Sequence, residues 1–338
     1  MRRNLVTAGL ATALFLVLAA GFLAIIGQPP VATLLDLVLY AFGDTYSLSE
    51  SLVKAIPILF CALAVIVPAR LGLISVGADG QLYLGALFGT AMVLWMPAAP
   101  GAILMPAMLL AGAVGGAALS LVAGGLRARF GVNETITTLL LNYVGVLLVN
   151  FVVYGPWKDP ANLGWPATIE FPPGATVPGL FGTRAHWGLA LAIGLAVVLH
   201  VVFASGRLGL RLRVLRENER VGRMAGLSFA RMVLLTMAVG GGVAGLAGII
   251  ETSAVQGRLQ PGLSLGYGLT GFLVAWLSGH SFLLAVPLSI LIGGLIAAGD
   301  TLQLFAKVPA SSMTILLGLL FAAMLAAAGI VKKRRGDA

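Results

Sequence analysis

Long apolar runs, separated by short polar or charged stretches, recur along the whole chain. Most are roughly 17 to 25 residues long, enough to cross a hydrocarbon core of about 30 Å as a helix. Lipid leaves the backbone only helices or a closed barrel, and the alternating pattern of barrel strands is absent. We therefore predict an all-α polytopic membrane protein with about ten transmembrane helices, at 5–26, 51–69, 82–97, 102–124, 135–154, 187–205, 232–250, 267–279, 281–299 and 312–331.

Two segments leave eight helices as an alternative count. The 267–279 run is short for a crossing, and 71–81 is a candidate re-entrant segment. The 31–42 segment, which contains Asp36, reads as a short external interfacial helix. The run at 5–26 exceeds the usual apolar core of a signal peptide, about 7 to 15 residues, so we expect a retained first span.

Composition agrees with a membrane protein. Hydrophobic residues make up 59% of the chain, charged residues 10%, and the mean hydropathy is +1.02. Soluble domains are nearer a quarter charged, so this chain has too few charges to cover a water-exposed surface.

Positive charge is concentrated in clusters beside apolar runs. The net charge is +9, and basic residues of short loops stay on the cytoplasmic side of a membrane. We read the clusters as orientation signals rather than as a nucleic-acid surface. We expect both termini to be cytoplasmic and the chain to form one transmembrane domain over 1–338. The loop at 155–186 is then external, and the clusters are Arg2 with Arg3, Arg127 with Arg129, 206–231 and 332–335.

The 206–231 segment is the most polar part of the chain. Its arginines are interleaved with Glu217, Asn218 and Glu219, and it lies between two apolar runs. Such a compact polar loop suits the docking of a cytoplasmic protein, and we predict that it is a docking surface. Binding of anionic lipid, at about 1 kcal/mol per basic residue near the surface, is the alternative.

A polar stripe begins the run at 135–154. Glu134, Thr138 and Asn142 are spaced at i, i+4 and i+8, so they share one helix face. Polar groups at membrane depth face protein or water rather than lipid. We interpret the stripe as a pathway lining or as a hinge against a neighbouring helix. The alternative is an ordinary helix start, in which Asn133 caps the first turn.

The segment GLISVGADGQLYLGALFG (72–89) interrupts an apolar run with Gly77, Asp79 and Gly80. Broken helices at membrane depth occur where the backbone is shielded by protein or lines a cavity. The alternative is a tight turn built on Asp79 and Gly80. We assign Asp79 and Gln81, together with the stripe, to a translocation pathway.

Two further patterns concern packing and docking. Closely spaced glycine pairs allow helix backbones to approach in lipid, and we expect packing inside one bundle, with a dimer interface or a mobile helix pair as the alternative. The polar stretch 251–268 is predicted to be external, where a delivery protein would dock. The glycine pairs are Gly85/Gly89, Gly112/Gly116 and Gly241/Gly245.

The sequence carries no motif for catalysis. It lacks GxxxxGK[ST] and HExxH motifs, and it has only 12 acidic residues. Cys61 is a lone cysteine, and the three histidines lack the spacing of metal ligands. We expect no enzymatic activity, cofactor or metal in this chain.

Four motifs follow one another along the chain, namely GLISVGADGQL, GVNETITTLLLNYVG, RVLRENERVGRMAGLSFAR and PGLSLGYGLTGFLVAWLSGH. They resemble the ordered motifs of ABC-importer permeases of the ribose and branched-chain amino acid type, most like the nucleoside subgroup. The resemblance covers about residues 50 to 330, and the sequence departs from the family pattern at 73–76 and 275–278.

The resemblance implies a permease domain in a bacterial inner membrane, a helical bundle like that of type II importers, a cytoplasmic coupling segment at 206–231 and a set of partner proteins. These are a second permease subunit, expected to be a different chain, two ATPase subunits that use ATP and Mg²⁺, and a solute-binding protein. It further implies that 206–231 meets the ATPase, with Ala225 and Gly226 closing the turn and contacts from Arg211, Arg213, Arg216, Glu217, Asn218 and Arg220.

The expected function is ATP-driven import by alternating access. A pathway with few charges suits a small neutral solute, and the resemblance favours nucleosides. Simple sugars or branched-chain amino acids remain alternative solutes. An ion-coupled secondary transporter, with Glu134 and Asp79 as its titratable groups, and a structural scaffold remain alternative classes.

Overall fold

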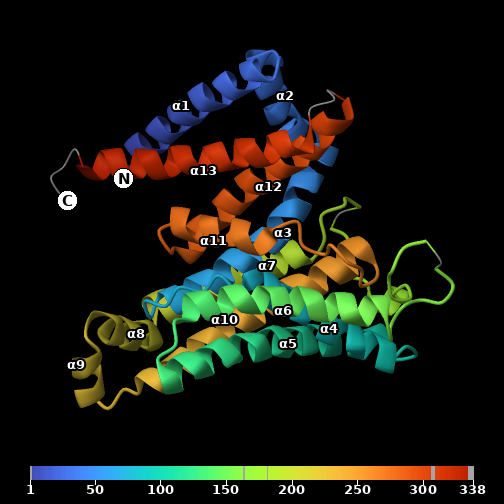
Figure 1. Cartoon of the computed structure of the whole chain (residues 1–338), viewed down its shortest axis with the longest axis vertical. Coiled ribbons are helices and arrows are strands. Elements are labelled where there is room, and N and C mark those ends of the chain that lie inside the picture. Colours follow the sequence, from blue (N-terminus) through green and yellow to red (C-terminus); the bar gives the residue numbers. More distant parts are fainter. Residues whose placement is uncertain (1, 163, 181, 306–308, 334–338) are drawn as a thin grey trace. The chain divides into compact units, whose positions relative to one another are not determined.

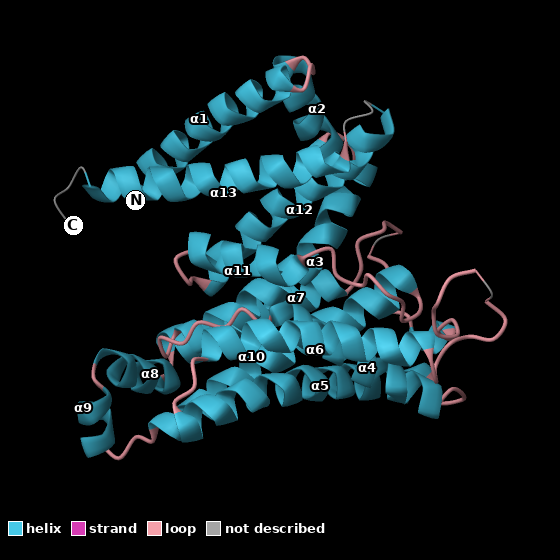
Figure 2. Cartoon of the chain, in the orientation of Figure 1, coloured by secondary structure: helices cyan, strands magenta, loops and turns pink. Residues whose placement is uncertain are grey.

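The computed structural model describes residues 2–162, 164–180, 182–305 and 309–333. Within these residues the chain is helical and contains no β-strand (Figures 1 and 2). The α-helices are α1 (Arg2–Ile25), α2 (Pro30–Phe42), α3 (Thr45–Ala69), α4 (Ala78–Trp95), α5 (Gly101–Phe130), α6 (Glu134–Tyr154), α7 (Gly188–Leu199), α8 (Arg207–Glu217), α9 (Glu219–Met224), α10 (Phe229–Glu251), α11 (Tyr267–Leu277), α12 (Phe282–Phe305) and α13 (Ala310–Lys333). A 3₁₀ turn, η1 (Pro173–Ala175), and two π-helical segments, η2 (His200–Ser205) and η3 (Thr252–Gln256), complete the described elements.

Six described helices are long and apolar enough to cross a membrane, and a bent pair raises the number to seven. The bent pair is Gly9–Ile25 with Pro30–Phe42, whose axes differ by 116°. The spans expected at 82–97, 267–279 and 312–331 are not among the six, and α11 has only 11 residues. The chain is therefore a multi-pass membrane protein, but the predicted count of about ten crossings is not confirmed.

Two compact units make up the chain, one from the residues up to Ala55 and from Ile290 onward, the other from Ile56–Ser289. In the first unit α1 runs along α13, and small and leucine side chains form the core. Lys54 Nζ lies 3.1 Å from Asp300 Oδ2 within this unit. The core residues are Ala19, Leu37, Ala41, Ala298, Leu302 and Leu316.

The second unit is organised around α4, α5 and α10, which run alongside one another (Figure 1). Glycines bring their backbones into contact. A Cβ atom added at Gly85 would lie 2.3 Å from Gly245 Cα, and one at Gly116 would lie 2.2 Å from the Gly241 carbonyl oxygen. The glycine pairs thus pack inside one bundle, as the sequence predicted.

The 155–186 loop is paired with the segment that follows α10. Thr168 donates its N–H to the Leu259 carbonyl at 2.9 Å, and its hydroxyl oxygen accepts from the Leu259 N–H at 3.0 Å. The Phe171 N–H donates to the Gly257 carbonyl at 2.8 Å. In η3 the Ser253 hydroxyl donates to the Ala175 carbonyl and accepts from Val177. The two segments that the sequence assigned to the external side therefore form one layer.

His186 closes this layer just before α7. The side chain is buried, and its Nδ1 accepts the Gly188 N–H at 3.2 Å. Burial disfavours the charged imidazolium and lowers the pKa of His186 to about 4. The imidazole is therefore neutral at neutral pH.

The glycine contacts between α4, α5 and α10, which we call the glycine seam, predict different effects for two alanine substitutions in α5. We expect Gly116→Ala to destabilise the protein by about 1–3 kcal/mol, because the methyl group overlaps the α10 backbone. Nothing lies within 4 Å of a Cβ at Gly125, so Gly125→Ala should be neutral or stabilising by up to about 1 kcal/mol. Thermal unfolding of the detergent-solubilised variants measures both, and equal effects would contradict the seam.

Burial of His186 predicts acid sensitivity of the 155–186 loop. The unfolded chain protonates this histidine near pH 6.5, whereas the folded chain does so near pH 4. Unfolding therefore takes up a proton between these values, so stability should fall by up to about 3 kcal/mol as the pH drops from 7 to 4. Thermal unfolding against pH should show this loss for the wild type and for His200→Gln, but a smaller loss for His186→Gln. An unchanged pH profile in His186→Gln would refute the assignment.

Candidate functional site

The chain between α3 and α4 leaves the helical path for several residues. Gly72 turns it with a φ of +86°, residues 73–77 have no regular structure, and α4 begins at Ala78. Asp79 and Gly80 lie in the first turn of α4, so the alternative of a tight turn built on them is wrong. We call residues 72–81 the broken segment.

The polar stripe of α6 holds the backbone of the broken segment. Glu134 Oε1 accepts the Ile74 N–H at 3.2 Å, and Thr138 Oγ1 accepts the Val76 N–H at 3.1 Å. Asn142 bonds twice, accepting the Gly80 N–H and donating to the Val76 carbonyl, each at 2.8 Å. Three side chains one helical turn apart thus supply partners to backbone groups at the helix break. The stripe faces protein, as predicted.

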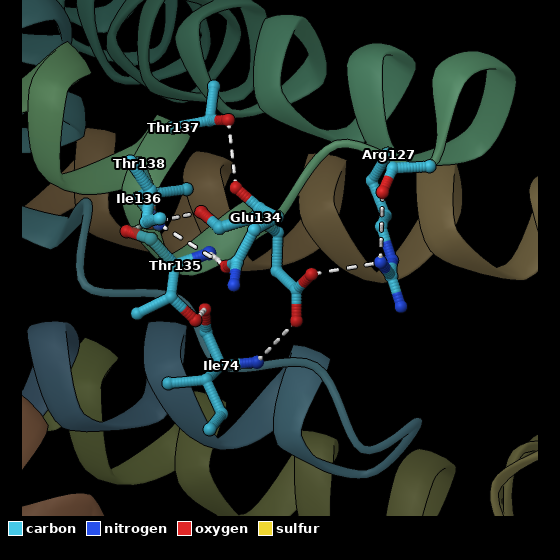
Figure 3. A network of polar contacts seen from close by, with 9 residues as sticks. Ile74, Arg127, Glu134, Thr135, Ile136, Thr137 and Thr138 are labelled. Carbon is cyan, nitrogen blue, oxygen red and sulfur yellow. Dashed lines mark hydrogen bonds and ion pairs between the residues drawn. The ribbon is translucent and has the colours of Figure 1, made fainter.

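Further contacts fix the start of α6 itself (Figure 3). Arg127 Nε lies 3.3 Å from Glu134 Oε2, and the Thr135 hydroxyl donates to the Ile74 carbonyl at 3.1 Å. Asn133 Oδ1 accepts the N–H groups of Thr135 and Ile136, which confirms its role as the helix cap. Glu134 therefore bridges α5 and the broken segment.

Glycines allow the broken segment to approach α6 closely. A Cβ at Gly80 would lie 2.7 Å from Asn142 Cα, and one at Gly145 would lie 2.6 Å from the Gly80 carbonyl oxygen. A Cβ at Gly77 would lie 2.9 Å from Thr138 Cβ. Larger residues at these positions would separate the polar side chains from their backbone partners.

Asp79 attaches the other side of the broken segment to α11. Its Oδ1 accepts from the Ser264 hydroxyl at 2.6 Å and from the Gly268 N–H at 2.9 Å. Ser264 Oγ in turn accepts the Tyr267 N–H at 3.0 Å, and Tyr83 accepts the Ser264 N–H at 3.2 Å. Asp79 therefore connects the first turns of α4 and α11.

Two members of this network were missed in the sequence. Tyr83 lies four residues after Asp79 on α4, so helical spacing offered a signal for it. Ser264 lies in an irregular loop far from Asp79 in the chain, and no local pattern indicates it. Gln81 is buried beside Gly77. Its assignment to the pathway, like those of Asp79, Glu134, Thr138 and Asn142, stays a prediction.

The 206–231 segment folds as two short helices, α8 and α9, joined at Asn218 (Figure 1). Asn218 Oδ1 accepts the N–H groups of Arg220 and Val221 and so caps α9. Leu212 and Leu215 are buried, and Gly226, with φ +78°, lies in the turn before α10. The exposed surface of the two helices also includes apolar Leu210, Val221 and Met224. The residues predicted to meet a partner are all exposed, and they are Arg211, Arg213, Arg216, Glu217, Asn218 and Arg220.

Acidic groups do not gather into a metal centre. Among the described residues no group of three or more histidine, cysteine, aspartate or glutamate side chains has the geometry to hold a metal ion. The carboxylates of the site, Asp79 and Glu134, bind backbone N–H groups and a serine hydroxyl instead. The site is built to position backbone segments.

Comparison with known proteins identifies the class of this architecture. A glucose ABC transporter permease protein of Haloferax volcanii is 32% identical over 86% of this chain and 81% of its own length. A nucleoside permease of Lactococcus lactis is 28% identical over 80% of this chain and 75% of its own length. A guanosine permease of Bacillus subtilis is 27% identical over 82% of this chain and 81% of its own length.

The family model described as "Branched-chain amino acid transport system / permease component" matches residues 47–327. This range contains the broken segment, the α6 stripe, α8 and α9. The chain is a membrane transport subunit rather than an enzyme, and it belongs to this family of ABC transporter permeases.

Proposed function

We propose that the chain is the permease subunit of an ATP-driven importer of nucleosides. The observation that carries the choice of solute is the likeness to two permeases named for nucleosides and guanosine, which extends over about four fifths of this chain. The glucose permease relative keeps sugars as the second candidate. Among the described residues of the broken segment, Asp79 is the only ionisable group, which suits a neutral solute.

The broken segment is the element that we expect to move with the solute. Its backbone is held by side chains of α6 on one side and joined to α11 through Asp79 on the other. Hydrogen bonds from side chains exchange partners more readily than the backbone hydrogen bonds of a continuous helix. This segment is therefore suited to take two positions in alternating access. Asp79, Gln81, Glu134, Thr138 and Asn142 would then line or gate the pathway.

The hydrogen bonds of the two carboxylates favour ATP-driven over ion-coupled transport. A coupling ion needs a carboxylate that exchanges a proton or cation during the cycle. Glu134 instead accepts a backbone N–H and pairs with Arg127, and Asp79 accepts from Ser264 and Gly268. Both groups have the contacts of structural anchors.

The expected partners are two ATPase subunits, a second permease chain and a solute-binding protein. The family supports an ATPase and a binding protein in general. We assign the ATPase to α8 and α9, with both termini on the same cytoplasmic side. We assign the binding protein to the layer formed by the 155–186 loop and the segment after α10, whose pairing presents one continuous surface.

Removal of one acceptor from the stripe tests the role of the broken segment. Thr138→Val leaves the Val76 N–H without its partner, a loss of about 1–3 kcal/mol for a buried donor, and should reduce ATP-dependent uptake in proteoliposomes at least tenfold. Thr137→Val is the matched control, because the Thr137 hydroxyl donates to the carbonyl of Asn133, the cap of its own helix, rather than to the broken segment. Equal uptake by the two variants at equal expression would remove the broken segment from the mechanism.

Co-purification tests the importer assignment. Mild-detergent isolation of the chain should recover an ATPase and a binding protein, and the recovered binding protein should bind guanosine rather than glucose. Arg211→Glu with Arg220→Glu should abolish ATPase recovery, because both exposed arginines lie on α8 and α9. Arg129→Glu, at the end of α5, is the control and should retain the ATPase.

Two other outcomes would contradict the proposal, one for the solute and one for the energy source. Selective binding of glucose would transfer the assignment to sugars. Isolation of the chain alone, with uptake that survives ATP depletion but not collapse of the ion gradient, would favour a secondary transporter.

A further inference from the structure

Cationic side chains lie near the end of α3, the start of α8 and the start of α12. Arg70 follows the last residue of α3, His280 precedes α12, and α8 begins just after η2. Arg70 Nη2 donates to the His280 carbonyl at 2.8 Å, and its guanidinium lies 5.0 Å from the centre of the Phe282 ring. The Phe282 ring lies 6.5 Å from that of Phe203 in η2. Arg70 is thus held in place at one membrane boundary.

Two arginines of α8 approach the same place. Arg213 and Arg216 are three residues apart and share one flank of the helix. The stem of Arg216 passes over Gly72, where an added Cβ would lie 3.4 Å from its Cγ. Burial, followed by the charges of Arg213 and Arg216, lowers the pKa of the Arg70 guanidinium. The arginines therefore lie close enough to repel one another.

No anionic group balances this charge in the described part of the chain. Arg70, Arg213 and Arg216 take part in none of the ion pairs formed there. Arg70 Nε is buried and has no acceptor among the described residues. Burial, with the charges of Arg216 and Arg70, lowers the pKa of His280, so this histidine adds no positive charge at neutral pH. The arrangement has donors and charge for an anion that the described residues do not supply.

The rim of the cluster has the character of a membrane interface. Trp276 is 43% exposed and meets the His280 ring edge-on at 5.1 Å. Leu283 and Leu284, in the first turn of α12, are also exposed. Tryptophan is enriched at the level of lipid headgroups, and exposed leucines beside it suit acyl chains. An anion that carries apolar chains therefore suits this surface better than free phosphate does.

We propose that Arg70, Arg213 and Arg216 bind the phosphate of an anionic phospholipid, with Trp276 and the start of α12 against its acyl chains. Basic pockets between transmembrane helices bind anionic headgroups in this way. The site shares α8 with the docking surface proposed for the ATPase, because Arg213 and Arg216 lie on that helix. Lipid binding itself requires only that the helices span a membrane.

Native mass spectrometry of the full-length protein, titrated with phosphatidylglycerol or phosphatidylcholine, tests the proposal. The wild type should retain phosphatidylglycerol in clear preference to phosphatidylcholine. Arg70→Gln with Arg216→Gln should weaken phosphatidylglycerol binding roughly tenfold or more, since each basic residue contributes to headgroup attraction. Arg211→Gln with Arg220→Gln removes the same charge from α8 and α9 and should change binding less than about twofold.

Each contrary result overturns the assignment. Equal losses in the two double variants would mean general surface charge, and displacement of the lipid by inorganic phosphate would mean a free-phosphate site. Unchanged lipid binding with loss of ATPase recovery in Arg70→Gln/Arg216→Gln would assign the cluster to a protein carboxylate. If the double variant does not fold, Arg216→Gln alone, which changes one exposed side chain, should also weaken phosphatidylglycerol binding and tests the same assignment. Lipid binding is measured without ATPase, so failure of the importer proposal would leave this result intact.

Discussion

The second unit depends on the need of every backbone N–H and C=O for a partner where water is scarce. A helix meets that need by itself, whereas residues 73–77 do not form one. The side chains of Glu134, Thr138 and Asn142 supply the missing partners, and Asp79 does the same for the first turn of α11. The polar side chains of this apolar bundle therefore lie where the backbone leaves the helical path. Without them, the backbone groups at the break would have no hydrogen-bond partner.

Periodicity predicted one half of this arrangement. The i, i+4, i+8 spacing in α6 identified a stripe facing protein, and the cap at Asn133 followed from its residue type and position. The partner of the stripe was not predictable, because each of its contacts with the broken segment joins residues about sixty positions apart in the chain. The link from Asp79 to Ser264 spans an even longer separation. Local patterns describe which face is polar, and only the fold determines what that face meets.

The helix count shows a different limit. Hydropathy locates apolar runs well, since the helices begin and end within a few residues of most of the expected spans. It does not show whether a helix that it locates crosses the membrane completely. The helix α11 begins at Tyr267, where the apolar run was predicted to begin, and it ends after 11 residues. A helix of this length spans about 17 Å, roughly half of the hydrocarbon core, so it is too short for a full crossing.

The glycine seam between α4, α5 and α10 also has an entropic side. Glycine has no side-chain rotamers to lose when helices associate, so contact between these backbones is formed without that loss of freedom. The glycines instead lower the stability of each helix before it packs, because each glycine weakens an isolated helix by about 1 kcal/mol relative to alanine. The three helices are therefore most pliable while they are separate and stiffen only on meeting. Their rigidity belongs to the assembled bundle rather than to any one of them.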